Sequence, residues 1–167
     1  DFNSVAKGYA VDVIASFLEE QKIENYLVEI GGELKAKGKN EKNEYWKIGI
    51  DNPNFDGTRT ISKLIRLKNQ SVAGSGNYRK FRIDSLGKKY VHTINPKTGF
   101  AKESNLLAAT VFGKMNCANA DAYATAFMAM GLEKTKFFLE NHKEIKVILF
   151  YQDEKNNLIT YTNYANN

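Results

Sequence analysis

VAKGYAVDVIASFL, residues 5–18, is the stretch that sets the character of this chain. Its larger apolar side chains recur at helical spacing, at Val5, Tyr9, Val13, Phe17, Ile14 and Leu18. A repeat of three to four residues is typical of an α-helix with an apolar stripe, and Asn3 or Ser4 precedes the stripe as a candidate N-cap. We therefore expect a helix over about residues 4–22.

Segments with the composition of β-strands follow this helix. Residues 26–30 end at Gly31-Gly32 and lead through 34–39 and a polar loop to 46–50, and these three segments resemble an antiparallel meander. Further strands are expected at 63–67, 71–74, 90–94, 106–112, 145–151 and 158–164, the last two as a hairpin across 153–157.

Two more helices are expected late in the chain. Residues 118–130 are rich in alanine and end at Gly131, a residue that favours a helix C-terminus, and 133–141 follow with helical character. Helices and strands therefore mix without strict alternation. The pattern predicts one α+β domain over residues 1–167, with a mostly antiparallel sheet covered by helices.

Composition narrows the functional classes. With 167 residues, 43% of them hydrophobic, the chain is long enough to bury a core of its own. Its net charge of +5 comes from scattered lysines, which argues against a nucleic-acid-binding stripe but is compatible with a small anionic ligand. No apolar run reaches the roughly 20 residues that a membrane span needs. Because the chain opens on Asp1, not Met, we expect its start to have been removed.

The single cysteine, Cys117, excludes an internal disulfide framework and a cysteine-based zinc site. Its neighbours are small and helical. We favour a buried, inert thiol over a nucleophile.

Asp121 and Thr125 are four residues apart on the expected helix 118–130, so they project from one face. Two hard oxygens at this spacing could share a cation, with carbonyls, waters or substrate phosphates completing its shell. The alternative is structural: Asp121 would favour the helix dipole near the N-terminus, and Thr125 would bond back to its own helix.

His92 stands at the end of an expected strand that feeds the turn Asn95-Pro96-Lys97-Thr98-Gly99. A histidine there could move a proton near neutral pH. It could equally be a hydrogen-bonded packing residue. Two glycine-bearing turns, 31–33 and 74–78, could bring backbone amides to a phosphate, although ordinary hairpin turns explain them as well.

Read in order, five motifs resemble the ApbE family of FAD:protein FMN transferases, whose fold is related to the T-fold. They are Asp1-x-x-Ser4-Val5-Ala6-Lys7-Gly8-Tyr9-Ala10-Val11-Asp12, Gly31-Gly32-Glu33, Ser75-Gly76-Asn77-Tyr78, His92-Thr93-Ile94-Asn95-Pro96-Lys97-Thr98-Gly99 and Ala120-Asp121-Ala122-x-x-Thr125. The resemblance extends over the whole chain, and the order of five motifs is far more specific than any one of them.

The resemblance implies Mg²⁺-dependent transfer of FMN from FAD to a Thr or Ser hydroxyl of an acceptor protein, with AMP leaving. By position, Ser4 would offer a main-chain carbonyl to the metal beside the side chains of Asp121 and Thr125, and His92 would be the general base. The residues implied to bind FAD are Asp1, Lys7, Gly31, Gly32, Ser75, Gly76, Thr93, Ile94, Pro96 and Thr98. Hydrolysis of FAD to FMN and AMP, a flavin-binding protein without turnover, and a purely structural module are the alternatives.

The sequence also departs from the family pattern. Ala124 stands where some relatives carry a further Asp, Glu33 follows Gly31-Gly32 in place of the commoner Asp, and Asn77 replaces an Asp. Family members carry an N-terminal portion before the first helix, so this chain would be the C-terminal part of such a domain, with a companion fragment as a possible partner.

The expected setting and partners also follow from the resemblance. Relatives work outside the cytoplasm, often lipid-anchored in the bacterial periplasm or at the cell surface, and they modify flavin-bearing subunits of membrane redox complexes such as the Na⁺-pumping NADH:quinone reductase.

Overall fold

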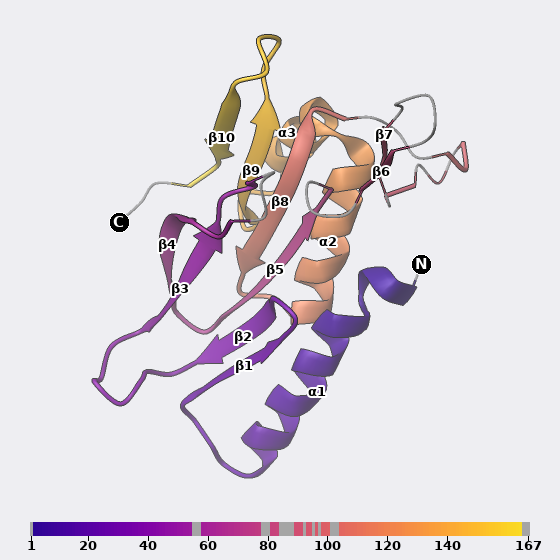
Figure 1. Ribbon diagram of the computed structural model, residues 1–167. Helices are drawn as coiled ribbons and strands as arrows, with labels where there is room; N and C mark the ends of the chain where they lie inside the picture. The colour runs from indigo at the N-terminus through magenta and orange to yellow at the C-terminus, as the bar shows by residue number, and fades with distance from the viewer. Residues whose placement is uncertain are drawn as a thin grey trace.

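The computed structural model of the chain describes residues 2–54, 58–77, 81–83, 89–91, 93, 94, 96, 98–100 and 104–164. Within these residues the fold is α+β, as predicted, with three layers: helices, a main antiparallel sheet and a small hairpin (Figure 1). No helix among the described residues is long and apolar enough to cross a membrane.

The helical elements are η1 (Phe2–Ser4), α1 (Ala6–Glu20), α2 (Cys117–Met130) and α3 (Leu132–Glu140). The strands are β1 (Tyr26–Ile30), β2 (Glu33–Lys37), β3 (Trp46–Asp51), β4 (Ile61–Leu67), β5 (Gln70–Gly76), β6 (Phe81–Ile83), β7 (Lys89–Val91), β8 (Leu106–Gly113), β9 (Lys146–Gln152) and β10 (Leu158–Thr162).

The described part of the main sheet has six strands in the order β1-β2-β5-β8-β9-β10, and every neighbouring pair is antiparallel. Val72 of β5 lies opposite Leu34 of β2 on one side and Phe112 of β8 on the other. The hairpin predicted at the end of the chain is confirmed as β9 and β10. The sheet therefore joins the start, middle and end of the chain.

The expected meander is confirmed for its first two strands, since β1 and β2 pair antiparallel, but the place of the third strand is wrong. β3 pairs with β4, with Trp46 opposite Leu67, whereas β2 takes β5 as its second neighbour. The hairpin β3–β4 instead covers one face of the main sheet, where Ile65 and Leu67 bury against Leu34 and neighbouring apolar residues. This face of the main sheet is apolar, and the hairpin buries it by packing on it instead of adding strands to the sheet.

The other face of the sheet is covered by α1, α2 and α3 (Figure 1). α2 packs on β5 and β8, with Ala120, Ala124 and Phe127 buried against the sheet. α1 packs on β1, β2 and α2. The alanines that make α2 narrow allow both the sheet and α1 to approach it closely.

The first helix differs in detail from its prediction. A 3-10 turn, η1, precedes α1, and the N-cap residue is Val5, with no side-chain capping bond from it. The buried positions of α1 are Gly8, Val11 and Ala15, whereas most of the large apolar residues of the predicted stripe are exposed. Periodicity detected the helix but did not show which side the sheet covers.

The structure corrects the strand predicted over residues 90–94 and confirms Gly131 as the end of α2. The strand predicted over residues 90–94 is shorter as described: β7 pairs with β6, which the sequence did not predict, in a separate two-stranded sheet. Gly131 follows α2 as predicted, with φ +84°, a conformation that favours glycine.

Candidate functional site

Asp121 is the buried acid at the centre of the candidate site. It lies in the second turn of α2 with only 3% of its surface exposed, and its Oδ2 accepts a hydrogen bond from the Gly8 amide at 3.0 Å. Burial raises its pKa, and the Gly8 amide and the Lys7 charge oppose that rise. The carboxylate is thus held at the first turn of α1, not at the N-terminus of its own helix as one reading of the sequence expected.

Thr125 lies one turn after Asp121 on α2, so both side chains project from one side of the helix. Its hydroxyl makes no hydrogen bond to a described residue, so the predicted bond back to its own helix is absent from that part of the chain. Asp121 and Thr125 therefore present hard oxygens in the arrangement that the sequence predicted.

Gly8 makes the crossing of α1 and α2 possible. A Cβ atom at this position would lie 2.5 Å from the carbonyl oxygen of Cys117 and 2.7 Å from its carbonyl carbon. These are backbone atoms, which cannot move aside as a flexible side chain can. Only glycine lets α1 approach closely enough for its amide to reach Asp121.

Asp12 forms the reciprocal contact at the same crossing. Its two carboxylate oxygens accept the backbone amides of Cys117 at 3.0 Å and Ala118 at 2.9 Å, which are the first two residues of α2. Lys35 of β2 also donates to Asp12 Oδ1, at 3.1 Å. Each helix therefore satisfies an N-terminal amide of the other through a carboxylate, and β2 is tied to the same point.

Lys7 links the crossing to the turn between β1 and β2. Its Nζ lies 2.5 Å from Glu33 Oε2 and 3.4 Å from the Gly31 carbonyl oxygen. Glu33 is only 1% exposed; burial raises its pKa, the Lys7 ammonium lowers it and the nearby Asp121 charge raises it further. Lys7, Glu33 and Asp121 are thus electrostatically coupled.

The Gly31-Gly32 turn is an ordinary two-residue hairpin turn. Ile30 and Glu33 pair across it, and both glycines have positive φ, +59° and +102°. This is the backbone conformation that two-residue hairpins favour. The turn places Glu33 beside Lys7, although the sequence alone could not show this function for it.

A second group of predicted residues gathers at the C-terminal end of β5. The turn predicted from residue 74 onward is wrong for its first residues, because β5 continues through Ser75 and Gly76 in pairing with β8. The next residue, Asn77, is buried and donates its backbone amide to the Leu107 carbonyl oxygen at 2.9 Å. Asn77 Oδ1 accepts a hydrogen bond from the Thr93 hydroxyl at 2.9 Å. The amide that replaces the family's acid thus fixes Thr93 against the sheet.

Of the remaining residues predicted for flavin binding or proton transfer, the structure describes three and leaves two outside the described ranges. Ile94, Pro96 and Thr98 are exposed, and the Thr98 hydroxyl accepts the Phe100 amide at 3.4 Å. Asp1 and His92 lie outside the described residues. The proton-transfer role predicted for His92 and the flavin contact predicted for Asp1 therefore stay predictions.

The set of possible metal ligands is oxygen-only. η1, which contains Ser4, contacts α2, the helix that carries Asp121 and Thr125. Across the described ranges there is no group of three or more His, Cys, Asp or Glu side chains that could hold a metal ion. Ala124, which stands where some relatives carry an acid, is fully buried in the apolar cluster under α2. A cation beside Asp121 would thus depend on hydroxyl, carbonyl, water or substrate oxygens.

Cys117 does not belong to the reactive groups, as predicted. It is fully buried, with Sγ 3.5 Å from the Leu34 carbonyl oxygen. Burial raises its pKa to about 12, with further contributions from Asp12, Glu33 and Asp121. The thiol is therefore protonated at physiological pH.

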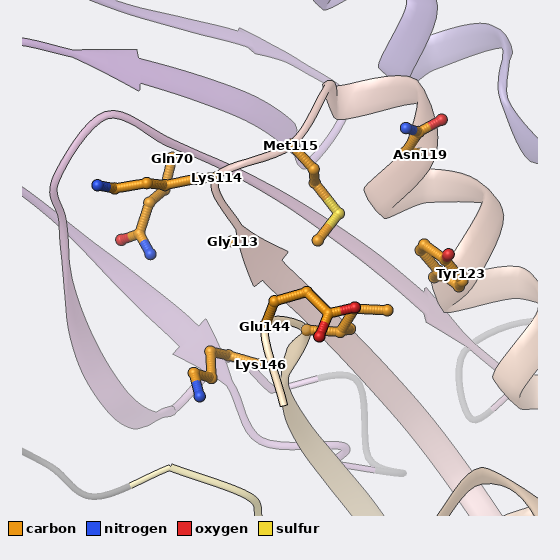
Figure 2. A pocket seen from close by; sticks show the side chains of 9 residues that line it. Gln70, Gly113, Lys114, Met115, Asn119, Tyr123, Glu144 and Lys146 are labelled. Carbon is orange, nitrogen blue, oxygen red and sulfur yellow. The ribbon is translucent and has the colours of Figure 1, made fainter. Parts of the chain in front are cut away.

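A cavity of about 440 Å³ lies on the side of α2 that faces away from Asp121 (Figure 2). Its wall includes Asn119 and Tyr123 of α2, each two residues from Asp121 and therefore on nearly the opposite face, together with Lys114 and Glu144. Charges of both signs line it. It is separate from the contacts around Asp121 and takes no part in the candidate site.

Sequence reasoning missed three structural functions at this site. The sequence assigns no function to Gly8 and Asp12 within the first motif, and it marks Glu33 only as a departure from the family. One signal could have suggested Gly8, because a glycine inside a helix often marks a close approach of backbones. The contacts of Asp12 and Glu33 depend on long-range pairing.

Comparison with known proteins gives a consistent result. The sequence model of the ApbE family matches residues 1–149. The chain is 38% identical over 161 residues to the FAD:protein FMN transferase of Haemophilus influenzae, a match that covers 96% of this chain and 42% of that protein.

Solved structures show the same likeness. The flavin transferase ApbE from Vibrio cholerae superposes with a TM-score of 0.82 at 34% identity, covering 97% of this chain and 50% of that one. The Pseudomonas stutzeri flavinyl transferase ApbE, in its apo form, gives a TM-score of 0.81 at 34% identity and covers 97% of this chain and 48% of that one. The chain thus spans about half the length of these relatives.

Proposed function

The chain belongs to the ApbE family, and on that premise we propose that it carries the catalytic side of a site that transfers FMN from FAD to an acceptor protein. The observation that supports this most directly is the buried Asp121 carboxylate, fixed by the Gly8 amide at 3.0 Å with Thr125 one turn away. A fixed acid beside a hydroxyl suits a site that handles a pyrophosphate with the help of a cation.

The proposed reaction is a phosphoryl transfer. The oxygen of an acceptor Thr or Ser hydroxyl attacks the phosphorus on the FMN side of the FAD pyrophosphate and forms a new P–O bond. The P–O bond to the bridging oxygen breaks, and AMP leaves with that oxygen. The hydroxyl proton passes to His92 as general base.

The residues around Asp121 fit a magnesium ion. Mg²⁺ prefers oxygen ligands, and Asp121 Oδ1, the Thr125 hydroxyl and the Ser4 carbonyl supply that chemistry. When bound, the ion would offset negative charge on the pyrophosphate oxygens. Oδ2 is already engaged by the Gly8 amide, so the chain itself sets the direction in which Oδ1 points.

Lys7, the Gly31-Gly32 turn and the C-terminal end of β5 would hold FAD. The Lys7 ammonium is anchored by Glu33 on one side and is half-exposed, so its remaining N–H donors are open to a phosphate at the edge of the site. Gly31, Gly32, Ser75 and Gly76 supply backbone with little side-chain bulk near that edge, and Thr93 is held by Asn77. Ile94, Pro96, Thr98 and Asp1 would complete the flavin contacts.

The test uses a joined polypeptide, in which the part of the V. cholerae relative that this chain does not match is fused to it in the relative's own order. It is incubated with FAD, Mg²⁺ and an acceptor domain that the intact V. cholerae transferase labels. We expect covalent flavin on the acceptor by mass spectrometry and release of AMP. Chelation of Mg²⁺ with EDTA should abolish both.

Variants assign the groups. Asp121→Asn keeps an acceptor for the Gly8 amide but removes the charge, and His92→Ala removes the base, so both should abolish labelling. Glu133→Gln on α3 removes an exposed charge and serves as the matched control. No labelling by the joined polypeptide at saturating FAD and Mg²⁺, while the intact relative labels the same acceptor, would contradict the proposal. AMP release that is unaffected by the acceptor would indicate FAD hydrolysis, and FAD binding without AMP release a protein without turnover.

The proposed acceptors are flavin-bearing subunits of bacterial membrane redox complexes. Such an acceptor places the reaction on the extracytoplasmic side of the membrane, where a lipid anchor would hold the enzyme near it. Cell fractionation of the native host with detection of the flavinylated band by in-gel fluorescence tests this part separately.

A further inference from the structure

α1 carries apolar residues on two opposite faces. Its inner face, with Gly8, Val11 and Ala15, is buried against the sheet and α2. Its outer face consists of Ala6, Tyr9, Ala10, Val13, Ser16, Phe17 and Glu20, which the 3.6-residue repeat places away from the buried positions. Ser16 and Glu20, in the last two turns, are the polar members of this face.

The exposed fractions on this outer face are large. Tyr9 is 64% exposed, Val13 50% and Phe17 58%, and each lies one helical turn after the previous one. Scattered single apolar residues are normal at a protein surface, but a continuous stripe of large side chains along a helix is not. A helix with apolar residues on both of its faces is typical of the interior of a structure.

The edge of the main sheet lies beside this helix. β1 is the terminal strand of the described sheet, and α1 packs on it (Figure 1). Among the described residues, the open edge of β1 and the apolar outer face of α1 therefore belong to two neighbouring elements. This combination fits a surface against which further polypeptide packs.

We propose that the outer face of α1 is the docking surface for the half of the flavin transferase fold that this chain does not span. This chain matches only about half of each relative named above. Each relative therefore has a further portion of similar length outside the matched part. Its contacting side must be apolar and uncharged to match Tyr9, Val13 and Phe17.

This docking would also complete the surroundings of the candidate site. Lys7 and Gly8, which contact Glu33 and Asp121, lie in the first turn of the same helix. Polypeptide packed along the outer face of α1 would therefore lie next to the candidate site at this first turn. The inference rests on family membership and exposure, not on the transferase activity.

Hydroxyl-radical footprinting of the joined polypeptide tests the proposal without any reference to activity. We expect Tyr9 and Phe17 to be oxidised as slowly as the buried Phe127, several-fold more slowly than Phe137 of α3, which is 68% exposed. Oxidation of Tyr9 and Phe17 as fast as that of Phe137 would overturn the proposal.

A pair of matched variants gives a second measurement. Phe17→Glu in the joined polypeptide should lower the urea midpoint and restore fast oxidation at Tyr9, whereas Phe137→Glu should change neither. Equal midpoints for the two variants would count against the docking surface. Sedimentation velocity identifies the other occupant: protection of Tyr9 and Phe17 that appears only at concentrations where the joined polypeptide dimerises would assign the face to a second copy and overturn the proposal.

Discussion

The backbone amide of Gly8 donates to the buried carboxylate of Asp121 at 3.0 Å, across 113 residues of sequence. The contact joins the first turn of α1 to the second turn of α2. In the opposite direction, Asp12 of α1 accepts two backbone amides at the start of α2. The acid proposed to bind the cation is thus fixed by backbone, so its position depends on how closely the two helices can cross.

Gly8→Ala should separate these helices. The new Cβ would meet Cys117 backbone at 2.5 Å, and because neither backbone can yield cheaply, we expect a loss of about 1–3 kcal/mol in the free energy of unfolding. Urea unfolding at neutral pH measures it. Gly74→Ala is the control, since its Cβ would meet no atom closer than 3.9 Å; an equal loss in both variants would refute the crossing argument.

Asp12→Ala should destabilise the start of α2. It removes the acceptor for the amides of Cys117 and Ala118, and loss of such a cap typically costs about 0.5–2 kcal/mol. Asp12→Asn keeps one acceptor oxygen and should cost less. Urea unfolding with amide hydrogen exchange at Cys117 and Ala118 distinguishes the two. Unchanged exchange in Asp12→Ala would show that the cap contributes little.

Glu33→Gln should change how stability depends on pH. Burial raises the folded-state pKa of Glu33 above its ordinary value of 4.5, so the folded state binds a proton more tightly than the unfolded state. The contribution of Glu33 is therefore fully present below pH 4.5 and is lost as pH rises through the raised value. The stability of wild type relative to Glu33→Gln should fall over that window.

This pH dependence is measured by urea unfolding of both proteins from pH 4 to pH 8 in EDTA. Asp121, whose pKa is also raised, is coupled to Glu33, so the difference reports the titration of Glu33 together with its effect on Asp121. A stability difference that stays constant, or that grows in favour of the wild type with pH, would mean that Lys7 outweighs the burial of Glu33.

Cys117 should be almost unreactive in the folded protein. With a pKa of about 12 in place of 9.0, its thiolate fraction at pH 8 falls about a thousand-fold, and the sulfur is buried as well. Labelling with a chromogenic disulfide should therefore follow unfolding. Rapid labelling in native buffer, at the rate seen in 6 M guanidinium (about the strength that unfolds most domains), would contradict this.

Part of the fold could be predicted from local patterns. The helix around residues 4–22, the alanine-rich helix that ends before Gly131 and the C-terminal hairpin all follow from periodicity and turn residues, and the structure contains them. The pairing of β3 with β4 could not, because each strand alone fits a meander equally well. The choice depended on which apolar sheet face needed a cover.

Part of the candidate site was likewise within reach. The helical spacing of Asp121 and Thr125 predicted two oxygens on one face, and the motif order indicated the family. The functions of Gly8, Asp12 and Glu33 could not be predicted from spacing, because each depends on a residue distant in the chain: Asp121, the amides of Cys117 and Ala118, and Lys7.

Local periodicity, composition and motif order are sufficient to predict the α+β class, the main helices, the inert cysteine and the membership of a family. The buried face of α1 and the acid that the Gly8 amide contacts follow from long-range packing instead. Periodicity cannot choose the buried face of α1, because both faces of this helix carry apolar residues. The hydrogen bond from Gly8 to Asp121 spans 113 residues, and it forms only because Gly8 has no Cβ and lets α1 pack closely against α2.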